Sequence, residues 1–260
     1  MASQTLSLRD GRFQVHYWTR GRGAPVLYLH GWMGMHEWPA WLDPLADRFR
    51  IVAPQHPGYG LTTGLEHLDD VIDFALYYLD LADALGLERP ALLGHSLGAN
   101  VALEMAALSP CSVGKLALVA PTGLWDEANP VADIFAMTDR DRDQMMWHNH
   151  DQAQAKGLVQ VPETDDEKRR SALDRTRALA AAAKFLFPIP DRGLKKRIHR
   201  VKAPTLLLWG AADRVVPPGY GKLFQQHIPS SQVVVVPEAA HMPHLEQPGK
   251  VLEAVGRFLG

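Results

Sequence analysis

Short apolar segments alternate with amphipathic segments along most of the chain. Eight segments are rich in Leu or β-branched residues: 5–10, 12–18, 25–30, 50–54, 90–95, 115–121, 204–210 and 232–238. The first two alternate between apolar and polar positions and are joined by Asp10-Gly11, which predicts a β-hairpin. The later segments are almost continuously apolar, as expected of strands that are buried on both faces of a parallel sheet.

Helical patterns lie between these predicted strands. Residues 68–86 carry apolar side chains at i, i+3 and i+4 spacing, and the pattern stops at Gly86. Similar patterns begin after Ser96 and cover residues 218–228 and 248–259. Alternation of strands and helices predicts a doubly wound α/β sheet.

Residues 122–192 break the alternation. They contain helix-like segments with Met, Phe and Trp but no clear strand. About 70 residues are too many for a crossover loop. We therefore predict an α/β core made of residues 1–121 and 193–260, with residues 122–192 inserted as a helical cap. The cap is expected over the carboxyl ends of the strands, where open α/β sheets bind their ligands.

The composition is that of a soluble globular protein. Of the 260 residues, 47% are hydrophobic and 22% are charged, and the net charge is −2. No basic stripe stands out, so we expect no nucleic-acid partner. No apolar stretch reaches about 18 residues and the N-terminus has no signal-like apolar region, so we expect no membrane segment and a cytoplasmic location. Cys111 is the single cysteine of this sequence, which excludes an intramolecular disulfide and a Cys-based zinc site.

A serine lies between two glycines where a predicted strand meets a predicted helix. Gly94-His95-Ser96-Leu97-Gly98 fits the G-x-S-x-G pattern of a nucleophile elbow in that context. Such a turn holds the serine in a strained backbone conformation, with its hydroxyl projecting from the sheet edge. Glycines are required on both sides because a Cβ atom would collide with the neighbouring helix and strand. The alternative role for Ser96 is that of an N-cap.

A serine nucleophile needs a histidine base and a carboxylate that orients it. In this topology the order along the chain is Ser, Asp or Glu, then His, with the last two in loops after late strands. Asp213 follows the strand predicted at 204–210, and His241 follows the strand predicted at 232–238. We therefore predict Ser96, Asp213 and His241 as the catalytic residues.

Other residues could fill the same roles. His244 lies three residues after His241 and is an alternative base, whereas Asp126 and Glu127 follow the strand predicted at 115–121 and are alternative acids. His95 lies inside the elbow, and we expect its side chain to point away from Ser96 and to pack.

The reaction also needs hydrogen-bond donors for a developing oxyanion. One donor is expected to be the backbone N–H of Leu97, and the second should come from the loop after the third strand. That loop contains Gly31, which lets the N–H of Trp32 face the site, with Met33 as the alternative donor. We expect His30 to hold the loop rather than to take part in the chemistry.

Five motifs together resemble the α/β-hydrolase fold family. They are HGWMG (30–34), PQHPGYG (54–60), GHSLGA (94–99), WGAADRVVP (209–217) and AAHMPHLEQP (239–248). The resemblance covers nearly the whole chain except the cap. It implies an eight-stranded, mostly parallel sheet with a helical cap insertion, a Ser96–Asp213–His241 triad and an oxyanion hole from Trp32 and Leu97.

Some branches of that family fit less well. Epoxide hydrolases and haloalkane dehalogenases place an aspartate where this chain has Ser96, and residues 122–192 lack the tyrosines that epoxide hydrolases use. Hydrolases that cleave C–C bonds resemble this chain in size and cap. They commonly carry Asn before the nucleophile and Trp after the histidine, where this chain has His95 and Met242.

Substrate specificity should reside in the cap. Phe135, Met145 and Trp147 are candidates for substrate contact, although the same side chains could form the core of the cap. A cap arginine that could hold an acidic substrate exists at Arg175 or Arg177, but both lie in a charged run that we interpret as a solvated face. We predict no cofactor and no metal, since the spacing in WHNHD (147–151) suits no common metal motif.

The sequence thus predicts a serine hydrolase of small to medium, fairly apolar carboxylic esters that acts through an acyl-enzyme. The partner is a small apolar ester, and the protein is a monomer or a homodimer. A C–C hydrolase of a vinylogous diketone is the first alternative. A non-catalytic ligand-binding module on the same scaffold is the second.

Overall fold

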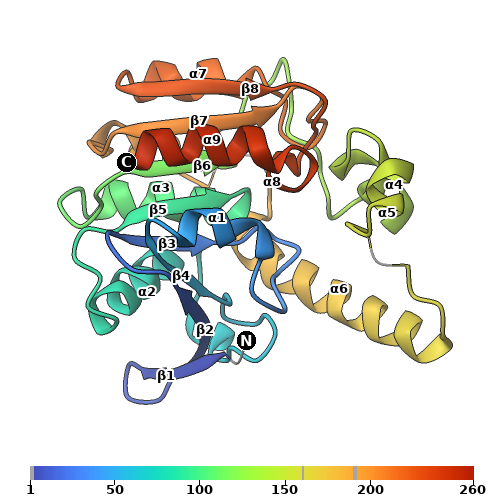
Figure 1. The fold of residues 1–260 in the computed structure, drawn as a ribbon, viewed down its shortest axis with the longest axis horizontal. Helices are drawn as coiled ribbons and strands as arrows, with labels where there is room; N and C mark the ends of the chain where they lie inside the picture. Colours follow the sequence, from blue (N-terminus) through green and yellow to red (C-terminus); the bar gives the residue numbers. More distant parts are fainter. Residues whose placement is uncertain (1–2, 160, 190–191) are drawn as a thin grey trace.

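One mixed sheet organises the chain. The computed structural model describes residues 3–159, 161–189 and 192–260. Its strands are β1 Gln4–Leu8, β2 Phe13–Arg20, β3 Pro25–Leu29, β4 Arg50–Pro54, β5 Ala91–His95, β6 Leu116–Val119, β7 Thr205–Gly210 and β8 Ser231–Val236. They form an eight-stranded sheet in the order β1-β2-β4-β3-β5-β6-β7-β8 (Figure 1). The predicted eight-stranded α/β sheet is confirmed.

The antiparallel part of the sheet is confined to one edge. β1 pairs with β2 and β2 pairs with β4 in antiparallel fashion, whereas all pairs from β4 to β8 are parallel. Residues 9–12 connect β1 to β2, and among them Arg9, Asp10 and Gly11 have φ angles of 50°, 56° and 89°. This left-handed turn confirms the hairpin that Asp10-Gly11 predicted.

Burial along the strands follows their place in the sheet. β6 and β7 are buried at every residue, as the continuous apolar pattern predicts. β8 has an equally apolar sequence, but Val235 is 49% exposed. The prediction of burial on both faces was wrong for β8 because it is the edge strand, with β7 as its neighbour in the sheet.

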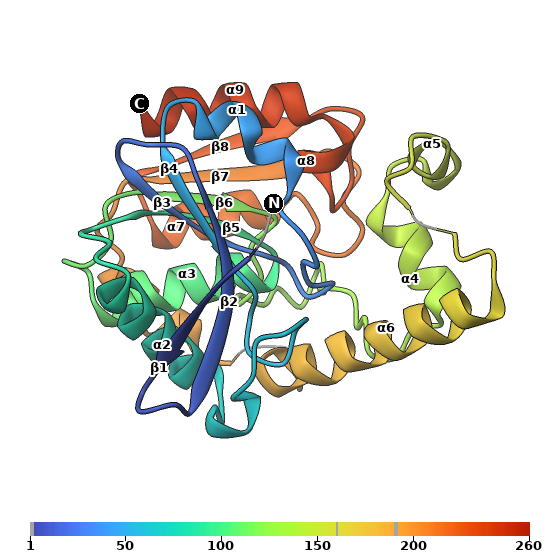
Figure 2. The ribbon, with the colours of Figure 1, turned by 60° about the horizontal axis from the view of Figure 1, so that its bottom comes forward.

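Helices cover both faces of the sheet (Figures 1 and 2). α2 Val71–Ala84, α3 Leu97–Leu108 and α7 Tyr220–His227 contribute to the larger apolar core, whereas α1 Asp43–Ala46 and α9 Pro248–Leu259 contribute to the second. α2 begins at Val71 because the Asp70 carboxylate accepts hydrogen bonds from the N–H groups of Ile72 and Asp73. The short helix α8 Pro243–Glu246 precedes α9.

The segment between β6 and β7 is helical, as predicted. It contains α4 Asp139–Met146, α5 His150–Ala155 and α6 Asp165–Leu186, and no strand among its described residues. The short 3-10 helices η3 Leu194–Lys196 and η4 Ile198–Arg200 lead back into the sheet. The boundaries of the core and the cap at 121/122 and 192/193 stay predictions.

The last turns of α6 pack on the core. The ring of Phe185 lies 4.3 Å from that of Phe74 on α2, and Tyr59 donates a hydrogen bond to the carbonyl of Ala178. The first turns extend away from the sheet (Figure 2). Within the described part of the chain, no helix has the length and hydropathy needed to cross a bilayer.

Candidate active site

Ser96 lies on a strained turn between β5 and α3. Its φ and ψ angles are 51° and −112°, in a region that residues with a Cβ rarely occupy. It precedes the first residue of α3, yet its side chain makes no capping hydrogen bond. The N-cap alternative therefore does not describe what the hydroxyl does.

Gly94 and Gly98 allow this turn to pack. A Cβ on Gly94 would lie 2.6 Å from the Cα of Ala99 in α3. A Cβ on Gly98 would lie 2.1 Å from the carbonyl oxygen of Leu29 at the end of β3. Any side chain at either position would collide with backbone, which is the physical reason for the two glycines.

Three side chains from distant parts of the chain meet in a row at this turn. Nε2 of His241 lies 3.0 Å from Oγ of Ser96, and Nδ1 of His241 lies 2.9 Å from Oδ2 of Asp213. Since the carboxylate only accepts, Nδ1 carries the proton and Nε2 accepts from the serine hydroxyl. All three residues are buried.

The second oxygen of Asp213 is also fully engaged. Oδ1 accepts hydrogen bonds from the N–H groups of Val215 and Val216, each at 2.9 Å. These two donors hold the carboxylate in the orientation in which Oδ2 accepts a hydrogen bond from Nδ1 of His241. The loop after β7 thus holds Asp213 through its own backbone.

The alternative base and acid lie elsewhere. The ring of His244 packs against Trp41 and His95, and burial lowers its pKa to about 3. The Asp126 carboxylate accepts hydrogen bonds from Ala128 and Asn129 within its own turn. Neither residue reaches Ser96 through a contact in the described residues.

His95 supports the loop that carries His241. Its Nε2 lies 2.9 Å from the carbonyl oxygen of His241, so Nε2 carries the proton and donates it. Burial lowers the pKa of His95 well below its usual value, with His244 and His241 adding to the effect. The ring packs against those of His241 and His244, and its bond to the backbone of His241 was not predicted.

The inserted segment is hydrogen-bonded to the same loop. The N–H of His241 donates to the carbonyl of Met146 at 3.1 Å. The two oxygens of the Glu246 carboxylate accept from the N–H groups of Ala240 and His148, both at 2.7 Å. Glu246 therefore joins the His241 loop to the chain between α4 and α5.

Arg214 makes a second connection between the insertion and a site loop. Its guanidinium donates to the carbonyls of Gln144 and Trp147, the second at 3.1 Å. Arg214 follows Asp213 directly, so the loop that carries the carboxylate is attached to the end of α4. Sequence reasoning missed Arg214 and Glu246 because their partners are backbone groups.

The loop after β3 brings Trp32 to the pocket that Ser96 also lines. No acceptor in the described ranges takes a hydrogen bond from the backbone N–H of Trp32 or Leu97, and Leu97 is the first residue of α3. Free N–H groups at a helix N-terminus favour negative charge. The side chain of Met33, the alternative donor residue, is exposed.

A pair of buried histidines holds this loop in place. Nε2 of His30 accepts a hydrogen bond from the N–H of His56 at 3.0 Å, and their ring centroids are 3.6 Å apart. Burial lowers the pKa of His30 to about 4 and that of His56 well below its usual value. Both rings are therefore neutral near pH 7, which fits a structural role.

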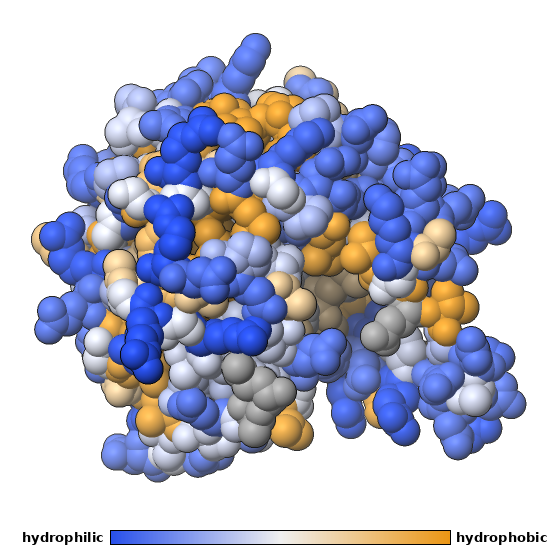
Figure 3. Space-filling model, in the orientation of Figure 1, coloured by the Kyte–Doolittle hydropathy of each residue, from blue (hydrophilic) through white to orange (hydrophobic). Residues whose placement is uncertain are grey.

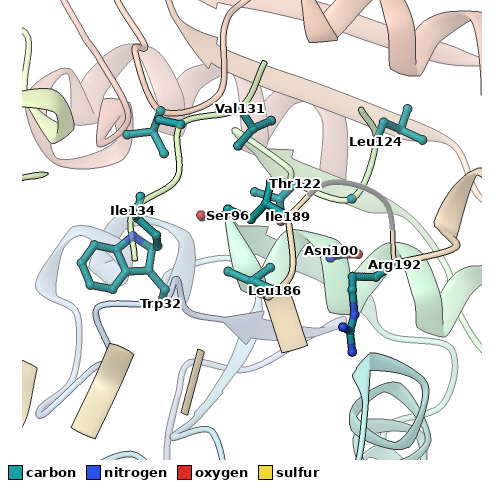
Figure 4. A pocket seen from close by; sticks show the side chains of 13 residues that line it. Trp32, Ser96, Asn100, Thr122, Leu124, Val131, Ile134, Leu186, Ile189 and Arg192 are labelled. Carbon is teal, nitrogen blue, oxygen red and sulfur yellow. The ribbon is translucent and has the colours of Figure 1, made fainter. Parts of the chain in front are cut away.

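A pocket opens beside Ser96 (Figure 4). Its lining is mostly apolar and comes from the core and the inserted segment: Trp32, Ser96, Asn100, Thr122, Gly123, Leu124, Val131, Ala132, Ile134, Leu186, Ile189, Arg192 and Val215. Figure 3 shows a hollowed, largely apolar surface between the core and the inserted helices.

The substrate-contact candidates from the sequence do not line this pocket. Trp147 is buried in the larger core, and Phe135 and Met145 pack against it. Their contact with substrate stays a prediction. In the described part of the chain, no group of three or more His, Cys, Asp or Glu side chains could hold a metal ion.

Comparison with known proteins identifies the fold family. The family model described as the alpha/beta hydrolase family matches residues 26–254. The chain belongs to this family. The resemblance that the five motifs carry is thereby confirmed.

Two relatives are named for different reactions. The chain is 29% identical over 253 residues to a pimeloyl-[acyl-carrier protein] methyl ester esterase of Nitrosomonas europaea, covering 90% of this chain and 95% of that protein. It is also 29% identical over 256 residues to the dihydrolipoyllysine-residue acetyltransferase component of the acetoin cleaving system of Cupriavidus necator, covering 96% of this chain and 67% of that protein.

A solved structure shares the fold. A variant of the meta-cleavage product hydrolase CumD superimposes with a TM-score of 0.76 and 20% identity, over 99% of this chain and 98% of that chain. At this identity the likeness extends to the fold and not to the substrate.

Proposed function

We propose that this protein is a serine hydrolase that cleaves small to medium, fairly apolar carboxylic esters through an acyl-enzyme. The observation that carries the proposal is the buried row of Ser96, His241 and Asp213, with separations of 3.0 Å and 2.9 Å. Family membership and the relative named as a methyl ester esterase support it. An ester is therefore the first substrate class to test.

The first half of the reaction forms the acyl-enzyme. Oγ of Ser96 attacks the ester carbonyl while Nε2 of His241 takes its proton. The N–H groups of Trp32 and Leu97 stabilise the oxyanion, which is worth about 3–4 kcal/mol for each donor of this kind. His241 then gives its proton to the leaving alcohol.

The second half releases the acid. His241 takes a proton from water as the water attacks the acyl-enzyme, and it returns this proton to Ser96. Asp213 holds the imidazole in the tautomer that accepts from Ser96 and stabilises its cation. Because burial keeps His95 and His244 neutral, the cation formed on His241 has no second positive imidazole beside it.

The pocket beside Ser96 supports an apolar substrate. Val131 and Ile134, which precede α4, and Leu186 at the end of α6 face the serine from residues 122–192. We propose that these residues form a cap and line the substrate site. The cytoplasmic location and the monomeric or dimeric state belong to the same proposal.

Hydrolysis of p-nitrophenyl butyrate by wild type, Ser96→Ala and Ser109→Ala tests the function. Ser109 ends α3 outside the pocket and is the matched control. We expect Ser96→Ala to lose about 10⁴-fold or more in kcat and Ser109→Ala to retain it. Equal rates for wild type and Ser96→Ala would overturn the proposal.

A ring-cleavage dienoate and a phosphonate probe, assayed beside the ester, separate the two alternative functions from ester hydrolysis. A C–C hydrolase would consume a ring-cleavage dienoate, seen as lost absorbance, and leave the ester untouched. A binding module would hydrolyse neither, and a phosphonate probe for activated serines would fail to label Ser96.

A further inference from the structure

The apolar pocket contains a short row of polar groups. Figure 4 shows Asn100 beside Ser96 and Arg192 beyond Asn100. Asn100 is four residues after Ser96 on α3, which is about 6 Å along a helix. A substrate that reacts at Ser96 therefore extends past these groups if it enters this part of the pocket.

Two of the polar groups are buried without a partner. Asn100 is 1% exposed, and its Oδ1 makes no hydrogen bond to any described residue. Oγ1 of Thr122 is buried in the same way. Both residues line the pocket, and buried polar atoms in native proteins are nearly always hydrogen-bonded. They point to a polar ligand group at this place.

The backbone of Gly123 lies close to the Asn100 amide, and both residues line the pocket. Gly123 has φ of 111°, and a Cβ on it would lie 2.8 Å from Oδ1 of Asn100. A larger residue at 123 would press on the amide. Glycine instead lets the loop after β6 approach the amide closely while the pocket stays open.

Arg192 adds a positive charge to the pocket lining. One of its guanidinium nitrogens donates to the carbonyl of Phe187 at 2.7 Å. No carboxylate in residues 3–159, 161–189 or 192–260 forms an ion pair with it. The bond to Phe187 uses one of the five N–H donors of the guanidinium.

The other arginines considered for an acidic substrate are placed differently. Arg175 forms ion pairs with Asp139 and Asp143, at 3.3 Å and 3.2 Å. Arg177 is exposed on α6. Neither lines the pocket. Arg192 is therefore the arginine that bears on the choice of substrate.

The Arg192 guanidinium, the Asn100 amide and the Thr122 hydroxyl can all bind the same kind of ligand. A guanidinium only donates hydrogen bonds, and a hydroxyl can donate one. The Asn100 amide has one acceptor oxygen and an NH₂ group with two donors, and a half-turn of the amide brings the NH₂ group to the place of Oδ1. A carboxylate accepts from all three, and its bonds to a cation are the strong kind. We propose that the pocket selects an ester that carries a carboxylate beyond a short apolar spacer, such as the half-ester of a dicarboxylic acid. This specificity rests on the proposed ester hydrolysis at Ser96.

Matched esters test the specificity. Ethyl hydrogen adipate and ethyl hexanoate have the same acyl length and differ in the terminal carboxylate. We expect kcat/KM of wild type to favour the half-ester by about tenfold or more, as hydrogen bonds to charged groups imply. Half-esters of succinate and glutarate then locate the best spacer.

Variants of Arg192 decide whether this residue carries the preference. We expect Arg192→Gln to lower the ratio of the two kcat/KM values by about tenfold and Arg192→Lys to keep part of it. Arg169→Gln, on the exposed start of α6 and outside the pocket lining, is the matched control and keeps the wild-type ratio. The kcat/KM values for the two esters are measured on one sample of each variant, so a loss of folded protein cancels in their ratio.

The outcomes separate this proposal from the one on which it rests. A wild-type preference for ethyl hexanoate, or an unchanged ratio in Arg192→Gln, overturns the carboxylate specificity while ester hydrolysis stands. If neither ester is hydrolysed and the phosphonate does not label Ser96, the serine-hydrolase proposal fails and the specificity fails with it.

Discussion

Nδ1 of His241 lies 2.9 Å from Oδ2 of Asp213, and neither side chain is exposed to solvent. The contact joins the loop after β7 to the loop after β8, across the end of the sheet. The other carboxylate oxygen is held by two backbone N–H groups, so this geometry is fixed from both sides.

Asp213→Asn tests the importance of this contact. The amide can turn its NH₂ group toward Nδ1, which then favours the tautomer that cannot accept from Ser96. We expect kcat for p-nitrophenyl butyrate to fall by about 10⁴-fold with the fold intact by circular dichroism. Asp126→Asn, on the surface turn after β6, is the control and should retain activity. A fall of less than tenfold in Asp213→Asn would contradict the role of the carboxylate.

Glu246→Ala tests whether the insertion positions His241. The change removes acceptors from the N–H groups of Ala240 and His148 and frees the His241 loop. With hydrogen bonds to a carboxylate worth about 1.5–3 kcal/mol, we expect kcat to fall about tenfold or more while KM changes little. Glu246→Gln keeps one acceptor and should recover part of kcat.

Glu253→Ala is the matched control for Glu246→Ala, since Glu253 is exposed on α9 and pairs with Arg257 there. A purely structural role of Glu246 would lower the thermal midpoint and leave kcat per folded molecule unchanged. That result would refute positioning.

Much of the fold could be predicted because its signals are local. The apolar strands, the helical periodicity and the glycines around Ser96 each depend on residues close together in the chain. The order of loops after strands then brought Ser96, Asp213 and His241 to one end of the sheet. The exposure of Val235 could not be predicted, because an edge strand and a central strand have the same apolar pattern.

The residues that line the pocket could not be predicted from the sequence, because the lining is formed by segments that are far apart in the chain. Trp147 and Ile134 are both apolar residues of the insertion and both belong to the larger core, yet of the two only Ile134 also lines the pocket. Nothing in the hydrophobic pattern separates these two residues. Glu246 was missed for a different reason, since its backbone partners leave no mark in the residue types.

Gly98→Ala tests the close packing under the elbow. The new Cβ would lie 2.1 Å from the carbonyl oxygen of Leu29, which is backbone and cannot give way. We expect the free energy of unfolding in urea to fall by about 1–3 kcal/mol or more. Gly249→Ala, near the start of α9 with nothing within 4 Å of a Cβ, should be neutral or raise it by up to about 1 kcal/mol. Equal stabilities for the two variants would show that the turn can relax.

The buried neutral histidines predict a loss of stability in mild acid. Burial lowers the pKa of His30 to about 4 and that of His244 to about 3, whereas a histidine in the unfolded chain titrates near pH 6.5. Below pH 6.5 the unfolded state binds more protons than the folded state, whereas above that pH the two states bind equally many at these rings. The free energy of unfolding should therefore be level above pH 6.5. It should fall by up to about 1.4 kcal/mol per pH unit for each such histidine between pH 6.5 and 4.

Urea unfolding from pH 7.5 to 4.5 measures this slope, and His244→Gln should make it shallower by one proton. His199→Gln, on the exposed surface, is the control and should keep the wild-type slope. A wild-type curve that is flat from pH 7 to 5 would show that these rings are protonated in the folded protein or hydrated within it.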